Sequence, residues 1–216
     1  MTVSNTPLLI AVDGPAASGK GTIARALARH FGLPHMDTGL LYRAAALSLF
    51  RFGGDAGSEF EAVRAVEGMA QIDPSDTELR SEVVGSIASR ISAYPGVRAA
   101  LLERQRLFAA QAGGAVLDGR DIGTVIAPNA TAKLFVTASS EVRAQRRLAE
   151  LTARGLNTHY DDVLIDIRAR DERDSGRSAA PLVKAEDADL LDSSDLSVEQ
   201  AIAAAIALVE RRIAAA

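Results

Sequence analysis

The chain of 216 residues contains no cysteine, which excludes a disulfide framework and a thiolate metal site. It has no apolar run long enough to span a bilayer and no charged-then-apolar signal pattern, so we expect a cytoplasmic protein without a membrane partner. Aromatic residues make up only 4% and the net charge is −4, which argues against an RNA-binding scaffold and against binding nucleic acid by bulk attraction. Any chemistry on phosphates must therefore depend on locally placed cations.

Lysine is also scarce, with three in the chain, and one of them lies in the stretch VDGPAASGKGT at 12–22. This stretch differs by one position from the signature of a phosphate-binding loop, because Gly21 replaces the hydroxyl residue and the hydroxyl follows at Thr22. The apolar run at 8–12 predicts a buried strand before the loop, and apolar residues at every fourth position predict a helix after it that Gly32 ends. A strand, a glycine-rich turn and a helix together let backbone N–H groups surround one anion.

Strand and helix patterns alternate along the rest of the chain. We expect further strands at 115–117, 133–136 and 190–191, and helices from Pro95 to Gly113, from Ser139 to near Gly155, over 160–173, and from Ser197 with Gln200 as its cap. This alternation predicts an α/β fold of the P-loop NTPase type, a parallel sheet with helices on both faces, as one domain over 1–216. The region from Gly53 to Tyr94 is predicted to be an inserted subdomain, with a capping box at Ser58 and Glu61.

Four later segments concentrate arginine, aspartate and small polar residues. They are DTGLLYRAAA (37–46), ASRISAYPGVRAALLERQR (88–106), LDGRDIGTVIAPNA (117–130) and RARDERDSGRSAAPL (168–182). Arg120 and Asp121 follow a predicted strand, at the edge where open α/β sheets bind ligands. Arg170, Asp174 and Arg177 share one face of a predicted helix, where they form either a binding surface or a solvated salt-bridge stripe.

The loop ending in GKGT and these four segments, in this order, resemble the bacterial cytidylate kinases from Ile10 to about Val209. The resemblance implies transfer of the γ-phosphoryl group of ATP to CMP or dCMP, giving CDP or dCDP and ADP in pyrimidine nucleotide metabolism. It implies Mg²⁺ carried mainly by the nucleotide phosphates, a monomer, an NMP-binding insertion at about 53–94 and a lid at about 155–180. From Gly53 to Arg80 the insertion is shorter and more helical than in many members of the family.

The resemblance also implies residue roles. The implied catalytic residues are Lys20, which we expect to face solvent, and Arg120, Arg170 and Arg177. The implied ATP-binding residues are Gly14, Pro15, Ala16, Ala17, Ser18, Gly19, Lys20, Gly21 and Thr22, with Arg146 against the adenine. The implied acceptor-binding residues are Thr38, Arg43, Ser89, Arg98, Arg120, Asp121, Arg170, Asp174 and Arg177. No residue is assigned as a metal ligand, although Asp118 or Asp121 could order water around Mg²⁺, and His30, His35 and His159 lack ligand spacing.

Cytosine presents an amine donor beside two ring acceptors, so a CMP pocket needs an acceptor and donors side by side. Asp121 can accept from the amine, while Arg98 and Ser89 can donate to the ring. Two alternatives remain open at this point. One is another P-loop kinase with a small acceptor, of the adenylate or shikimate type. The other is a nucleotide-dependent switch, which the lack of an Asn-Lys-x-Asp motif disfavours.

Overall fold

A five-stranded sheet with the strand order β2-β3-β1-β4-β5 forms the centre of the computed structural model, which describes residues 7–215. The strands are β1 (Leu9–Asp13), β2 (His35–Asp37), β3 (Ala115–Gly119), β4 (Ala132–Thr137) and β5 (Asp189–Asp192). Every neighbouring pair is parallel, which confirms the predicted α/β sheet. The expected domain also included residues 1–6 and 216, which lie outside the described residues.

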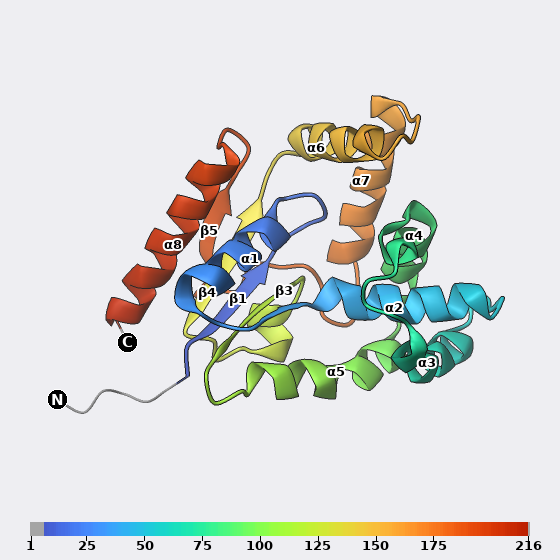
Figure 1. Ribbon diagram of the computed structural model, residues 1–216, viewed down its shortest axis with the longest axis horizontal. Coiled ribbons are helices and arrows are strands. Elements are labelled where there is room, and N and C mark those ends of the chain that lie inside the picture. Colours follow the sequence, from blue (N-terminus) through green and yellow to red (C-terminus); the bar gives the residue numbers. More distant parts are fainter. Residues whose placement is uncertain (1–6, 216) are drawn as a thin grey trace.

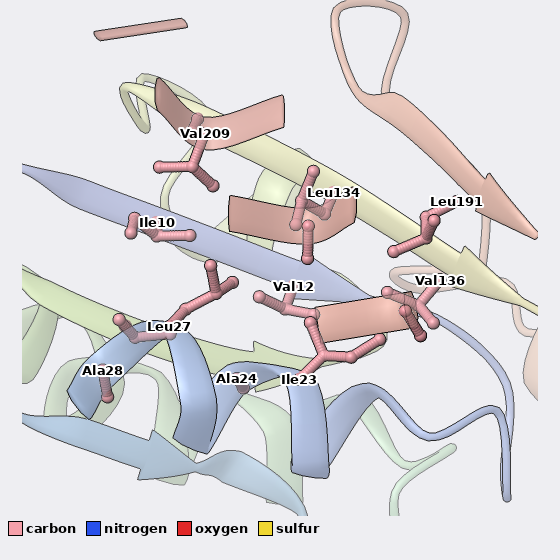
Figure 2. Close-up of a cluster of buried hydrophobic side chains, with 14 residues drawn as sticks. Ile10, Val12, Ile23, Ala24, Leu27, Ala28, Leu134, Val136, Leu191 and Val209 are labelled. Carbon is pink, nitrogen blue, oxygen red and sulfur yellow. The ribbon is translucent and has the colours of Figure 1, made fainter. Parts of the chain in front are cut away.

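Helices cover both faces of this sheet (Figure 1). On one face, α1 (Lys20–Phe31) and α8 (Val198–Ala215) pack on β1 and β4 through an apolar cluster that includes Val12, Leu27 and Leu134 (Figure 2). On the other face lie α5 (Pro95–Ala109) and a π-helical turn, η3 (Ile122–Ile126). The central strand β1 is buried from its second residue onward, as its continuous apolar sequence predicts.

The segment 53–94, all of which is described, contains helices and no strand, in agreement with its helical sequence pattern. Its helices are α3 (Glu59–Gly68), α4 (Glu82–Ile91) and the short 3₁₀ helices η1 (Met69–Gln71) and η2 (Thr77–Arg80), and they pack on α2 (Thr38–Arg51) around their own apolar cluster. Ser58 caps α3, but the carboxylate of Glu61 accepts from the backbone of Asp55 at 2.9 Å, so the predicted capping box is only half formed. In Figure 1 these helices lie to one side of the sheet.

Two further helices, α6 (Ser140–Ala153) and α7 (Tyr160–Ser175), pack against each other through Leu151, Val163 and Ile167. Helix α7 also contacts α4, so the pair α6 and α7 meets the helices of segment 53–94 over the carboxyl ends of the strands (Figure 1). The full capping box predicted at the start of α8 is present, because Ser197 and Gln200 exchange backbone-to-side-chain bonds of 2.9 and 3.2 Å. Among the helices of residues 7–215, none has the length and apolar character needed to cross a membrane.

Candidate active site

The loop between β1 and α1 folds tightly against the end of β4. Gly14 has φ of 155°, and a Cβ at this position would lie 2.0 Å from the carbonyl oxygen of Val136, so only glycine fits. Gly19 adopts a left-handed conformation (φ 85°) directly before α1 begins. The hydroxyl of Thr22 lies at the exposed start of α1, where it accepts from Arg25 at 3.3 Å. The N-terminal end of α1, whose first N–H groups have no partner within the helix, therefore lines the larger cavity described below, as anion binding requires.

Lys20 does not face solvent as the sequence suggested. It is half-buried, and its ammonium group donates to the carbonyl of Pro15 at 3.3 Å. Burial, together with the positive charge of Arg120, lowers the pKa of Lys20 to about 7, although the carboxylates of Asp118 and Asp37 oppose this shift. The expectation was wrong because the fold brings residues that are far apart in the chain, Arg120 and Asp118 among them, close to the lysine.

Arg146 lies near the phosphate loop, and the loop after β5 holds its guanidinium. Its guanidinium donates to the hydroxyl of Ser193 at 3.0 Å and to the carbonyl of Ser193 at 2.6 Å. A Cβ on Gly19 would lie 3.9 Å from the same guanidinium. Arg146 is therefore fixed between the loop after β5 and the phosphate loop.

The residues expected to bind the acceptor come together in one small cavity of about 70 Å³. Its lining includes Thr38, Arg43, Ser89, Arg98, Arg120, Asp121, Arg170, Asp174 and Arg177. The cavity is far smaller than a typical ligand pocket, because the arginine and aspartate side chains pair with each other inside it. A second cavity of about 770 Å³ adjoins it and is lined by loop residues that include Gly19, Gly21 and Thr22. Arg120 and Arg170 line both, so the two cavities meet at these arginines.

Asp174 is the centre of the cationic half of the small cavity. Its carboxylate accepts from Arg120 Nε at 2.7 Å and from the guanidinium of Arg177. Burial raises the pKa of Asp174, but the charges of Arg120 and Arg177 outweigh burial and hold the pKa below its usual range. Burial and the charge of Arg120 lower the pKa of Arg170 to about 9, and its buried Nε has no partner among the described residues. These arginines form a concentrated, desolvated field of positive charge that suits phosphate oxygens.

A second group of residues that lines the small cavity presents an acceptor and donors side by side. Arg98 donates to the carboxylate of Asp121, and both side chains are almost fully buried. Ser89 is buried next to them, where its hydroxyl lies 3.5 Å from Arg173 Nε. Arg43 is held from the insertion, because its Nη1 donates to the carbonyls of Leu79 at 2.8 Å and Ser81 at 3.2 Å.

Sequence comparisons identify the family of this chain. The family model described as cytidylate kinase matches residues 10–211. The chain belongs to the cytidylate kinase family. Cytidylate kinase from Xanthobacter autotrophicus is 59% identical over 207 residues, which cover 95% of this chain and 98% of that protein. The cytidylate kinase from Azorhizobium caulinodans is 56% identical over 206 residues, with coverage of 94% and 98%.

Among solved structures, an uncharacterized protein from Eubacterium ventriosum shares the fold. Its TM-score is 0.55 at 13% sequence identity, and the match covers 94% of this chain and 98% of that one. At this identity the likeness concerns the fold alone. The specific relationship to cytidylate kinases therefore comes from the sequence relatives.

Two polar residues of this cytidylate kinase family member, His35 and Asp37, were given no role from the sequence. His35 is partly buried, and its Nε2 lies 2.8 Å from Asp118 Oδ1. Asp118 in turn lies beside the phosphate loop, since a Cβ on Gly21 would be 3.7 Å from its Oδ2. Burial and the nearby charge of Asp118 raise the pKa of Asp37. The signal for Asp37 and Asp118 was their position at strand ends, which the motifs had already marked.

The two carboxylates that were candidates for ordering magnesium water differ in their surroundings. Asp121 already pairs with Arg98, whereas the charges of Asp118 and Asp37 act on Lys20 and Asp118 also lies near Gly21. Carboxylate oxygens suit Mg²⁺, which keeps several of its waters when it rides on a nucleotide. Within residues 7–215 no group of three acidic, histidine or cysteine side chains forms a ready-made metal cage. The donor set therefore fits a metal that arrives with its nucleotide.

Proposed function

We propose that this protein transfers the γ-phosphoryl group of ATP to CMP or dCMP and so forms ADP and CDP or dCDP. The observation that carries the proposal is the buried Asp121 carboxylate beside Arg98 and Ser89, at one end of a cavity whose other end is lined by arginines. Cytosine needs an acceptor for its amine next to donors for its ring, and its monophosphate needs fixed cations. Membership of the cytidylate kinase family supports the same substrate.

The phosphate loop from Gly14 to Thr22 would hold the ATP phosphates through its N–H groups, and Lys20 would add the mobile charge. Arg146 would offer its flat guanidinium to the adenine while it remains anchored on Ser193. Asp37 and Asp118 would hold waters of the Mg²⁺ that the nucleotide brings, and this metal would neutralise charge on the phosphates.

On the acceptor side, Arg43, Arg120, Arg170 and Arg177 would surround the CMP phosphate and the transferred group. Thr38, whose hydroxyl donates to the carbonyl of Asp118 at 2.8 Å, would close the phosphate end. Asp174 would accept from the sugar hydroxyls with Arg170 beside it. No general base is required, because the phosphate dianion of CMP is itself a nucleophile, so catalysis is positioning and charge stabilisation.

Residues 53–94 would act as the NMP-binding insertion and residues 155–180 as a lid. Arg177 donates to Ser92 Oγ at 2.8 Å, which joins the lid to the insertion. Arg147 pairs with Glu82, which joins the insertion to α6, the helix on which the lid helix α7 packs. Because the acceptor cavity is too small for a nucleotide, these contacts would have to open before CMP enters. The net charge and the composition support small nucleotides rather than nucleic acid as partners. The protein would act as a monomer in the cytoplasm.

The experiment is a coupled assay of ADP formation with CMP, dCMP, UMP, AMP, GMP and shikimate as acceptors. We expect CMP and dCMP to be the preferred acceptors and UMP to be weaker, because uracil presents an acceptor where cytosine presents its amine. Preference for AMP or shikimate would assign the chain to another kind of P-loop kinase. ATP hydrolysis that does not depend on any acceptor would indicate a nucleotide-driven switch instead.

A further inference from the structure

A buried carboxylate at the end of β1 plays no part in the chemistry described so far. Asp13 is 5% exposed and is the last residue before the phosphate loop. Its Oδ1 accepts from the backbone N–H of Ile122 at 2.8 Å, and its Oδ2 accepts from the backbone N–H of Gly123 at 2.8 Å. Two charge-assisted bonds thus join the strand that leads into the ATP loop to the segment that follows β3.

The bonded segment is the start of the π-helical turn η3. The first N–H groups of a helical turn have no partner within the turn, and Asp121, which precedes η3, makes no side-chain cap. Asp13, at the end of β1, therefore caps η3 although it lies far from it in the sequence. Its negative charge lies at the N-terminal end of the turn, where N–H groups point outward. The space is tight, since a Cβ on Gly123 would lie 3.4 Å from Asp13 Oδ2 and 3.1 Å from Lys133 Cδ.

The residues just before the capped N–H groups are the ones that face the acceptor. Arg120 reaches Asp174, and Asp121 reaches Arg98, from backbone that is continuous with Ile122. A small rotation at Ile122 would move both side chains, and the productive geometry of such groups tolerates only fractions of an ångström. We propose that Asp13 is a positioning residue that fixes Arg120 and Asp121 for recognition of the cytosine base and its phosphate. This inference rests on the proposed function, because it assigns a support to that same site.

The surroundings of Asp13 shift its pKa into a range in which its protonation can be followed experimentally. Burial, helped by the charge of Asp121, raises the pKa of Asp13 to about 6, although the N–H groups of Gly123 and Ile122 and the charge of Arg120 oppose this shift. The aliphatic part of Lys133, a residue of β4, lies against Gly123. Its ammonium group donates to the carbonyl of Pro128 and to the carboxylate of Asp187. Protonation of Asp13 removes one of its two acceptors, so the grip on η3 weakens as the pH falls through this range.

The test compares Asp13→Asn with the wild-type protein and with the control Asp73→Asn. Asp73 also accepts a backbone N–H, that of Ser75 at 2.8 Å, but in an exposed turn of the insertion. An asparagine at position 13 turns a donor toward one of the two N–H groups, so η3 loses one bond while the shape of the side chain is kept. We expect the ratio of kcat/KM for CMP to that for UMP to fall on the order of tenfold in Asp13→Asn, with the KM for ATP and the melting temperature little changed. Asp73→Asn should keep the wild-type ratio.

The wild-type pH profile provides a second readout. Between roughly pH 5.5 and 8 the CMP-to-UMP ratio should fall on acidification with a midpoint near 6, and this dependence should vanish in Asp13→Asn. Titration of the acceptor phosphate affects both substrates alike and cancels in the ratio. An unchanged ratio in Asp13→Asn, or a pH profile shared by variant and wild type, would overturn the positioning role.

A third readout needs no activity and no variant. The amide resonances of Ile122 and Gly123 in the wild-type protein should titrate together with the same midpoint and exchange slowly with solvent. Amide resonances that do not change with pH in this range, or amides that exchange rapidly with solvent, would contradict the cap itself. Failure of the wild-type protein to phosphorylate CMP would instead contradict the proposed function and leave the amide titration as the test of Asp13.

Discussion

Binding of ATP should draw a proton from solution onto Lys20. In the structure, burial and the charge of Arg120 lower the pKa of this lysine to about 7. The triphosphate would place several negative charges next to the ammonium group, which returns the pKa toward the ordinary value of lysine, about 10.4. The lysine would therefore be largely neutral at alkaline pH before binding and charged afterwards.

The size of the effect follows from the two pKa values. At pH 8, a group with a pKa of about 7 is protonated in roughly one molecule in ten, and with ATP bound it is protonated in nearly all, so about 0.9 proton is taken up. By linkage, the affinity for ATP should then fall by roughly eightfold for each pH unit above 8. Isothermal titration calorimetry in buffers with different ionisation enthalpies measures the proton uptake directly.

Lys20→Arg is the matched variant, because a guanidinium is charged in both states and should bind ATP without proton uptake. Lys184→Arg is the control, since Lys184 is exposed and bonds only to the carbonyls of Ala185 and Ala188, and it should keep the wild-type uptake. Uptake below about 0.2 proton in the wild type at pH 8, or equal uptake in Lys20→Arg, would refute the reasoning.

Three further predictions concern the acceptor site and the lid. Asp121→Asn should lower kcat/KM for CMP by roughly ten- to a hundredfold, because a charge-assisted bond of about 1.5–3 kcal/mol is lost, while UMP should lose much less; equal losses on both would mean that cytosine is read elsewhere. Amide exchange over 155–180 should slow when CMP and an unreactive ATP analogue bind together, and rates that ignore both ligands would indicate a rigid helix. Glu82→Gln removes the ion pair with Arg147, so amides of α7 should exchange up to about fivefold faster without nucleotide, and unchanged rates would mean that this pair does not hold the lid.

Local patterns in the sequence were enough to predict the sheet and the phosphate loop. The apolar run of β1, the glycines after it and Gly32 at the end of α1 each act on neighbouring residues, so their consequences can be read without the fold. The same holds for Ser197 and Gln200, which form the predicted capping box. At Ser58 the pattern was equally good, but Glu61 found a competing donor in the preceding turn, so only one of its two bonds formed.

Sequence motifs were enough to list the candidate acceptor-binding residues, but they could not predict how these side chains pair with one another. Arg98 and Asp121, or Arg120 and Asp174, are separated by 23 and 54 positions, and nothing in a linear pattern says that each aspartate has an arginine as its partner. In the proposed function, these pairings would fill the acceptor cavity until contacts with a nucleotide replace them. They would keep the arginines available for phosphate without leaving their charges unopposed in a buried site.

Asp13 and Lys20 show what depends on the tertiary structure alone. Each lies inside or next to the loop motif that the sequence made conspicuous, but the properties that matter come from residues about a hundred positions away, Ile122 and Gly123 for one and Arg120 for the other. Both side chains meet the same short segment after β3. That segment thus links the strand that leads into the phosphate loop, the lysine of the loop and the acceptor cavity, because Arg120 lowers the pKa of Lys20 and Asp121 lines the cavity.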